Sequence, residues 1–209
     1  MKTFSWPLLV SSLLHAAMLF SQDRPGLFFR EDWKEIPAAL PVTQEHVSNP
    51  GLVMTRHGPG EAGIKKSHHD QPADDPYYIW SGEAEGTWAI SLRHQNHWVD
   101  LTGLARIRWR SKQAGFRLLR IILKTSQGEW LVSDQYDPAS SDWLVREFNV
   151  ADIRWRRLNV KSLVEGAWVD KPDLTRIEEI GWTDLMRGGG SIACSRLDWI
   201  EVYGKPVPR

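Results

Sequence analysis

The chain has 209 residues, and its 26 Lys and Arg residues balance its 26 Asp and Glu residues. A net charge of zero gives no electrostatic reason to expect nucleic acid or an anionic membrane surface as a partner. A single cysteine excludes an internal disulfide and any zinc site built on cysteines. Twelve tryptophans are many for this length, and an indole ring can fill a core or offer a ligand a flat surface.

The N-terminal residues have the pattern of an export signal. Lys2 precedes an apolar run over residues 6–20, and cleavage is expected near Ser21. We therefore expect a signal peptide over residues 1–21, a secreted or periplasmic protein, and no stable membrane insertion after cleavage. The alternative is an uncleaved membrane anchor, which the shortness of the run disfavours.

Short stretches of alternating or dense apolar residues follow, separated by Gly, Pro, Asn and Asp. They predict strands at residues 27–36, 52–57, 77–82, 87–92, 105–111, 117–125, 129–134, 142–149, 180–185 and 195–203. About ten short strands with closely spaced turns predict an all-β protein, a β-sandwich of the jelly-roll type, with a single domain over residues 27–204.

The segments between the later strands are expected to lack strands of their own. Residues 150–158 are expected to be irregular, and residues 163–171 to form a loop. Residues 173–177 are expected to form one helical turn capped by Asp173. Cys194, beside the last strand, is expected to be a small buried residue.

The tryptophans divide by their neighbours. Those with apolar strand neighbours are expected in the core: Trp33, Trp88, Trp109 and Trp199. Sugar recognition needs flat apolar surfaces beside planar polar groups. The aromatic residues among polar or charged neighbours are therefore candidates for exposed ligand contacts, although burial remains the alternative for each: Trp130, Trp155, Trp168, Tyr77, Tyr78 and Tyr136.

Residues 58–76 form a polar stretch rich in Gly and Pro, and a long loop within a domain is often functional. It contains the candidate ligand contacts His68, His69, Asp70 and Asp75, which His94 and His97 could join from neighbouring strands. Three interpretations stay open: a solvated structural loop, a ligand-contact loop, and an acid–base site acting on a glycoside. In the third, His69 and Asp75 are the candidate catalytic residues.

Arginines are concentrated at residues 106–110 and 154–157. One interpretation is a site for acidic glycans, because a guanidinium pairs with a carboxylate through two hydrogen bonds. The other is a solvated strand face whose charge is balanced by nearby Glu and Asp. The sequence has no glycine-rich phosphate loop, no Gly-x-Ser-x-Gly elbow and no His-Glu-x-x-His motif.

Three motifs in the second half carry a family resemblance: Val-Asp-Leu-Thr-Gly-Leu at 99–104, Pro-Asp-Leu-Thr-Arg-Ile-Glu-Glu-Ile-Gly-Trp at 172–182, and Leu-Asp-Trp-Ile-Glu-Val-Tyr at 197–203. Over residues 99–203 the chain resembles the galactose-binding-like jelly rolls. The likeness is greatest to the domain shared by family-11 carbohydrate-binding modules and complex-I intermediate-associated proteins.

The resemblance implies a β-sandwich that holds an oligo- or polysaccharide on a concave face or in a cleft between loops. It also implies a structural calcium that joins early and late strands, with Asp198 as one ligand and Glu31 or Asp32 as partners. Calcium requires several oxygen ligands.

Three functions follow as hypotheses. The first is a secreted carbohydrate-binding protein without catalytic activity. The second is a small glycan-active enzyme, either a glycoside hydrolase or a polysaccharide lyase, that uses the loop from His68 to Asp75. The third is a structural or assembly protein that binds another protein through the same face.

Overall fold

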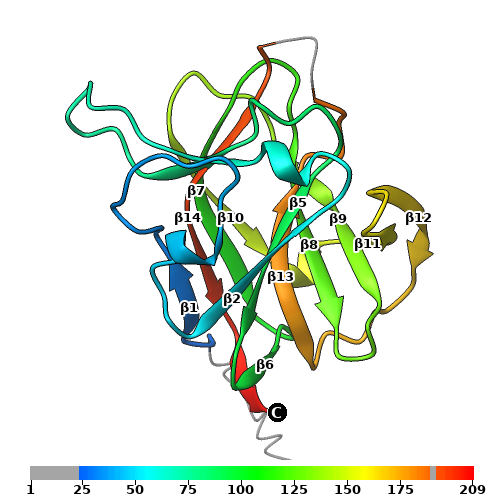
Figure 1. The fold of residues 1–209 in the computed structure, drawn as a ribbon. Coiled ribbons are helices and arrows are strands. Elements are labelled where there is room, and N and C mark those ends of the chain that lie inside the picture. Colours follow the sequence, from blue (N-terminus) through cyan, green and yellow to red (C-terminus); the bar gives the residue numbers. More distant parts are fainter. Residues whose placement is uncertain (1–23, 189–191) are drawn as a thin grey trace, which may run out of the picture.

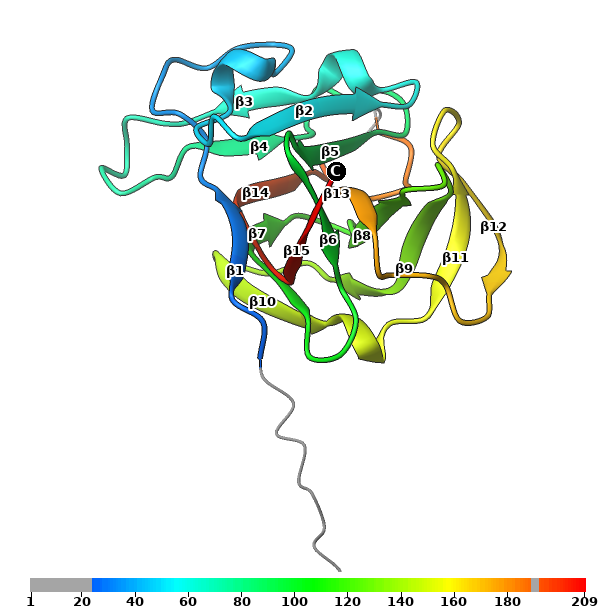
Figure 2. The same cartoon turned by 90° about the horizontal axis from the view of Figure 1, so that it is seen from below.

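The computed structural model describes residues 24–188 and 192–209, which form two antiparallel β-sheets packed face to face (Figures 1 and 2). The expected signal peptide at residues 1–21 lies outside the described residues. The two packed sheets confirm the β-sandwich predicted from the sequence. In the part of the chain that is described, no helix is long and apolar enough to span a membrane.

The first sheet has the strand order β10-β7-β14-β4-β3, and β1 pairs with the other side of part of β14. Its strands are β1 (Leu27–Glu31), β3 (Lys65–Ser67), β4 (Tyr78–Trp80), β7 (Arg106–Gln113), β10 (Leu144–Asn149) and β14 (Ser195–Tyr203). The long central pair β7 and β14 thus joins segments far apart in the chain.

The second sheet has the order β12-β11-β9-β8-β13-β5-β2. In addition, β6 pairs with the first residue of β13, and β15 pairs with β6. Its strands are β2 (Leu52–His57), β5 (Ala89–His94), β6 (His97–Asp100), β8 (Leu119–Thr125), β9 (Trp130–Asp137), β11 (Trp155–Asn159), β12 (Val164–Val169), β13 (Ile177–Thr183) and β15 (Lys205–Pro208). Short 3-10 helices lie in the connections at Gln44–His46, Glu61–Gly63 and Val150–Asp152.

Strand β7 shows how the sequence produces this arrangement. Its residues alternate between half-buried and buried over the whole strand, because successive side chains of a strand point to opposite faces. Ile107 and Trp109 enter the core, where Trp109 packs edge-on against Phe148 at 4.9 Å between ring centroids. Arg106, Arg108 and the following arginine project from the outer face.

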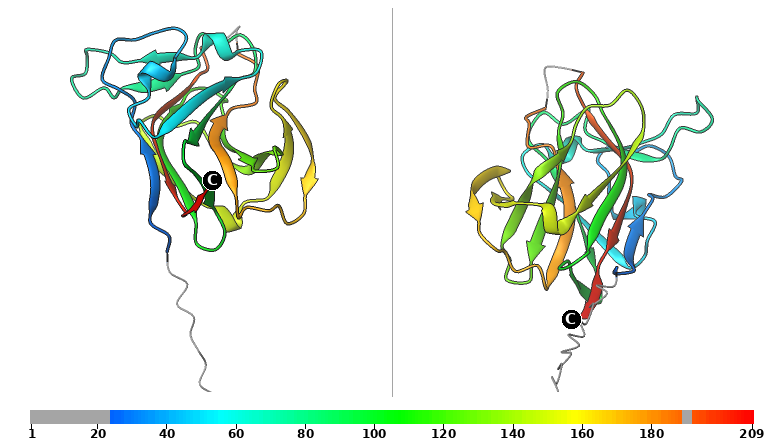
Figure 3. Two further views of the ribbon diagram at one scale, coloured as in Figure 1. Left: turned by 60° about the horizontal axis from the view of Figure 1, so that its bottom comes forward. Right: turned by 180° about the vertical axis from the view of Figure 1, so that it is seen from behind.

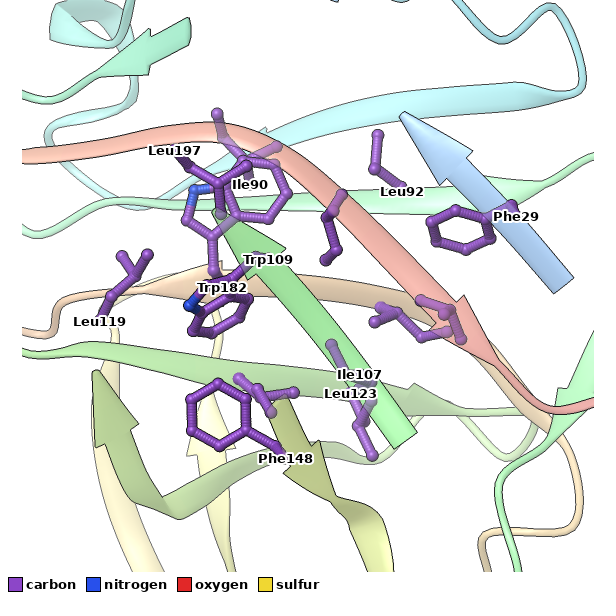
Figure 4. Packing of buried hydrophobic residues seen from close by; sticks show 14 of the residues in the cluster. Phe29, Ile90, Leu92, Ile107, Trp109, Leu119, Leu123, Phe148, Trp182 and Leu197 are labelled. Atoms are coloured by element: carbon purple, nitrogen blue, oxygen red, sulfur yellow. The ribbon is translucent and has the colours of Figure 1, made fainter. Parts of the chain in front are cut away.

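The core lies between the two sheets and draws side chains from both of them (Figure 4). Trp182 of β13 is fully buried there, with its ring 5.8 Å from that of Trp33. Trp33, Trp88 and Trp109 are buried as expected, and so is Cys194.

Several expected boundaries were wrong. The first strand ends at Glu31, because Trp33 adopts a positive φ of 60° that an extended strand does not contain. Residues 173–177 form no helical turn. The Asp173 carboxylate instead accepts the backbone N–H of Thr175 at 3.0 Å, and Ile177 begins β13.

The segments expected to be irregular also contain strands. β11 (Trp155–Asn159) begins inside the range expected to be irregular, and β12 lies where a loop was expected. The two strands pair with each other and extend the edge of the second sheet (Figure 3). β15 extends the domain beyond residue 204, the expected end.

Candidate functional site

A polar cleft of about 580 Å³ opens between the loop at residues 68–77 and the outer face of the first sheet. We refer to it as the polar cleft. The loop connects β3 to β4 and projects from the side of the molecule (Figures 1 and 2). The lining residues are Arg30, Asp32, Trp33, Glu35, His68, Ala73, Asp74, Asp75, Pro76, Tyr77, Arg110, Asp198 and Trp199.

The sheet side of the cleft is organised around Arg30 of β1. Its guanidinium donates hydrogen bonds to both carboxylate oxygens of Asp32, at 2.8 Å each from Nε, and to Glu201 at 2.5 Å. The same group lies 4.5 Å from the ring centroid of Trp199. Planar, charged and aromatic groups are therefore held in fixed positions on one wall.

Asp198 reaches the same wall because the pairing of β14 with β7 shifts register between Leu197 and Trp199. Consecutive strand residues normally point to opposite faces, and an irregularity of this kind lets two neighbours line one surface. The Asp198 carboxylate accepts a hydrogen bond from Arg110 at 2.8 Å. Burial raises the pKa of Asp198 to about 6, against the opposing effect of the Arg110 charge.

The loop side of the cleft presents Tyr77 and His68, whose rings stack at 4.0 Å with an angle of 12° between their planes. Behind the cleft, the Lys66 ammonium lies 3.8 Å from the Tyr77 ring. Lys66 is fully buried and donates a hydrogen bond to the carbonyl of Ile36. Burial lowers the pKa of Lys66 to about 8.

His69 and Asp75 form a directly bonded pair at the outer side of the loop. Asp75 accepts the backbone N–H of His69 at 2.8 Å and lies 3.0 Å from its Nδ1 atom. Asp75 also lines the cleft, whereas His69 and the exposed Asp70 do not. The two adjacent histidines thus separate, as alternation along an extended chain requires.

The remaining histidine candidates lie elsewhere. His94 of β5 and His97 of β6 contact each other at 5.2 Å between ring centroids, beside Phe28. Burial lowers the pKa of His94. Neither residue lines the cleft, so the structure does not join this pair to the 68–77 loop.

The aromatic candidates divide between exposed and buried. Tyr136 and Trp168 are exposed as expected, and Trp130 is half-buried on the second sheet. Two guanidinium groups already lie 4.2 Å from the Trp168 ring, those of Arg154 and Arg156.

Two aromatic residues expected to be exposed are buried instead. Trp155 is only 2% exposed, because it occupies an inward position of β11 between outward-facing arginines. Tyr78 is also 2% exposed, packed edge-on against Trp143 at 5.3 Å. Its hydroxyl lies 3.2 Å from His69 Nδ1.

The three candidate calcium ligands separate into two environments. Asp32 and Asp198 line the cleft, but Glu31 is fully buried on the other face of β1. There its carboxylate accepts the backbone N–H groups of Trp33, Ser48 and Asn49 at 2.7–2.9 Å. Within the described residues, no three His, Cys, Asp or Glu side chains form a group suited to hold a metal. Calcium therefore stays a prediction from the resemblance.

Sequence reasoning missed some of the residues that form the site. Trp199 was expected in the core, but it is half-buried on the outer face. Arg30 and Glu35 had no local signal, since their role depends on strands paired across the whole chain. The alternation of Arg110 with buried residues along β7 was the one available clue.

A second polar network, also unforeseen, lies on the outer face of the second sheet. Ser91 donates a hydrogen bond to Glu179 at 2.5 Å and lies 2.8 Å from Nε2 of His57. Lys124 bonds the other oxygen of Glu179 at 2.9 Å, and the edge of Trp130 contacts His57. Burial lowers the pKa of His57. Ser91 is fully buried, so this network supports the sheet surface rather than presenting a nucleophile.

The charges of the polar cleft determine which ligands suit it. Two arginines face five carboxylates, and both arginines are already paired with acids. An acidic ligand would meet net negative charge, whereas sugar hydroxyls can donate to carboxylates and accept from guanidinium groups.

The positive charges of the other β7 arginines are likewise balanced by neighbouring carboxylates. Arg106 and Arg108 lie within 3.5 Å of Glu147, and Arg108 also lies 3.2 Å from Glu201. This is the arrangement of a solvated strand face with balanced charge.

No protein-family profile matches the sequence, and no curated protein matches it. Among solved structures, the family 11 carbohydrate-binding module of the cellulosomal cellulase Lic26A-Cel5E of Clostridium thermocellum is 12% identical, covering 82% of this chain and 97% of its own, with a TM-score of 0.48. The family 11 module from Clostridium thermocellum in complex with a β-1,3-1,4-mixed-linked tetrasaccharide is 13% identical and covers 84% and 100%, with a TM-score of 0.48.

A family 29 carbohydrate-binding module variant complexed with mannohexaose is 13% identical and covers 84% of this chain and 92% of its own, with a TM-score of 0.47. Identities this low describe a likeness of fold and say nothing of the ligand. The chain is thus similar to family 11 and family 29 carbohydrate-binding modules.

Proposed function

We propose that this protein binds a neutral oligo- or polysaccharide in the polar cleft, without cleaving it. The observation that carries the proposal is the convergence of Trp199, Arg30, Arg110 and Asp198 with the loop residue Tyr77 around one open hollow of about 580 Å³. The N-terminal pattern supports export, which brings such a protein into contact with extracellular glycans.

The physical basis is a match between the cleft and the two kinds of surface on a sugar. The indole of Trp199 offers apolar area at low entropic cost, because Arg30 holds it in place. Hydroxyl groups require donors and acceptors in fixed positions. Arg110 and Asp198 supply one of each, 2.8 Å apart, on a rigid strand pair.

The geometry favours binding over hydrolysis. A glycosidase places two carboxyl groups about 5–9.5 Å apart on either side of the scissile bond. His69 and Asp75 instead bond directly at 3.0 Å, and the imidazole lies outside the cleft with 64% of its side chain exposed. This pair orders the loop, and the cleft holds the ligand.

Calorimetric titration with a panel of neutral and acidic oligosaccharides tests the proposal. We expect binding within the neutral group, weaker binding of uronates, and no release of shorter products. Trp199→Ala is expected to lower affinity about tenfold or more, the size typical of a central aromatic contact. Tyr136→Ala, which removes an exposed ring of the second sheet, is the matched control and is expected to leave affinity unchanged.

Thermal unfolding of both variants separates lost contacts from lost folding. A panel in which no neutral oligosaccharide binds the wild-type protein would overturn the proposal. Equal loss of affinity in Trp199→Ala and Tyr136→Ala would move the site away from the polar cleft.

A further inference from the structure

The polar cleft continues into a row of side chains along the outer face of the first sheet. Three residues of β14 stand directly opposite three arginines of β7. The cross-strand pairs are Trp199 with Arg110, Glu201 with Arg108, and Tyr203 with Arg106. All six side chains lie on the face away from the core, because their neighbours Ile107, Trp109, Ile200 and Val202 are buried.

Contacts within the row hold its side chains in place. The guanidinium of Arg106 lies 3.9 Å from the ring centroid of Tyr203, and the Tyr203 hydroxyl donates to Glu201 at 3.0 Å. Arg108 bonds the same carboxylate at 3.2 Å. Side chains held by their neighbours lose little conformational entropy when a ligand covers them.

The row remains open to solvent. Side-chain exposure is 20% for Arg106, 32% for Arg108 and 35% for Arg110. The view from behind in Figure 3 shows β7 and β14 side by side on this face. A ligand that leaves the cleft can therefore lie across their side chains.

The far end of the row meets a second hollow of about 240 Å³. Its lining includes Arg106 and Glu147, together with Gly103, Asn149 and Asp152. Arg110 and Arg106 are four residues apart on one strand, which corresponds to roughly 13 Å. Two hollows are thus joined by a straight row of planar and charged groups, which is longer than a single sugar ring.

We infer that the ligand is an extended glycan chain, which begins in the polar cleft and runs along β7 and β14 to the second hollow. This inference rests on the proposed function and specifies its ligand class as linear oligo- or polysaccharide. Tyr203 and Arg106 form the distal part of the site. They contact only ligands long enough to leave the cleft.

The charge of the row agrees with a neutral chain. Arg106 and Arg108 are offset by Glu147 and Glu201, each within 3.5 Å of an arginine nitrogen. Hydroxyl groups can bond to such pairs without displacing either charge. A polyanion would have to compete with both carboxylates.

The experiment is a titration with an oligomer series, from disaccharide to octasaccharide, of the neutral glycan that binds the wild-type protein best. We expect affinity to rise at least tenfold with length and then to level off. Tyr203→Ala is expected to abolish this rise while leaving the disaccharide affinity within twofold of wild type. Trp199→Ala is expected to weaken ligands of every length.

Tyr203→Phe and Arg106→Gln keep the test independent of folding defects. The first retains the ring and loses only the bond to Glu201, so it is expected to keep most of the length dependence. Arg106→Gln is expected to reduce the length dependence of the affinity. Tyr136→Ala again serves as the control for loss of an exposed ring.

The outcomes separate the two proposals. Binding that is equally strong at all lengths, or a Tyr203→Ala variant that weakens the disaccharide and the octasaccharide alike, overturns the extended site and leaves the cleft intact. Failure of every neutral oligomer to bind overturns both.

Discussion

Asp198 and Arg110 lie 2.8 Å apart on neighbouring strands, and their ion pair forms part of the wall of the polar cleft. Burial raises the pKa of Asp198 to about 6, so this pair breaks within a pH range that is easily reached. Protonation of Asp198 leaves Arg110 without its charged partner and removes one carboxylate charge from the cleft.

The first prediction concerns pH. Between pH 7.5 and 5 the affinity for a neutral oligosaccharide is expected to fall several-fold, because Asp198 gains a proton and no longer fixes Arg110. Asp198→Asn is expected to bind with an affinity that is constant over this range. His68→Gln, which replaces the imidazole of the same cleft, is expected to retain the decline. A decline that persists in Asp198→Asn contradicts the assignment.

The same shift has a consequence for folding. The folded-state pKa of Asp198 lies above the ordinary value of 3.8, so the folded protein binds this proton more tightly than the unfolded chain does. The stabilisation of the folded state that results from this tighter proton binding is fully present below about pH 4 and is lost as pH rises through about 6. Chemical denaturation of Asp198→Asn should lack this contribution.

The second prediction concerns Asp137, which is buried where β9 ends. Its carboxylate accepts hydrogen bonds from Trp109 Nε1 at 3.0 Å, from Arg146 Nε at 3.0 Å and from the hydroxyl of Ser111. Asp137→Ala leaves buried donors without an acceptor. The free energy of unfolding is therefore expected to fall by about 3 kcal/mol.

Urea denaturation measures this change. Asp170→Ala, which truncates an exposed aspartate after β12, is the matched control and is expected to alter stability by no more than about 0.5 kcal/mol. Similar losses in both variants would show that the hydrogen bonds of Asp137 contribute little.

The strands that the sequence predicts well are those with one face in the core. Along β7, the alternation of Arg106, Ile107, Arg108 and Trp109 matches the observed burial. β12 was missed because it is an edge strand, exposed along nearly its whole length. A strand without a buried face has no hydrophobic period to detect, and its pairing with β11 is set by tertiary structure.

The candidate site was predictable only in part. His68, Asp75 and Tyr77 share one polar loop, so local composition identified them together. Trp199 was assigned to the core because dense apolar neighbours hide the register shift beside Asp198. A single sequence carries no local sign of that shift, or of which strand will lie opposite.

The third prediction concerns Gly181, in the middle of β13 between β5 and β8. A Cβ atom at this position would lie 1.9 Å from the carbonyl oxygen of Ile90 and 2.7 Å from the Cα atom of Ser91. Both are backbone atoms of a paired strand and cannot move independently. Gly181→Ala is therefore expected to destabilise the protein by about 2–3 kcal/mol, as overpacking in a core does.

Gly26→Ala is the matched control, because a Cβ atom there would meet nothing within 4 Å. Replacing glycine by alanine at an unstrained position usually stabilises a protein by about 0.4–1 kcal/mol, since the unfolded chain loses conformational freedom. The two substitutions are thus expected to shift the midpoint of thermal unfolding in opposite directions. A Gly181→Ala variant as stable as wild type would mean that the spacing between β13 and β5 is wider than described, and with it the packing of the second sheet.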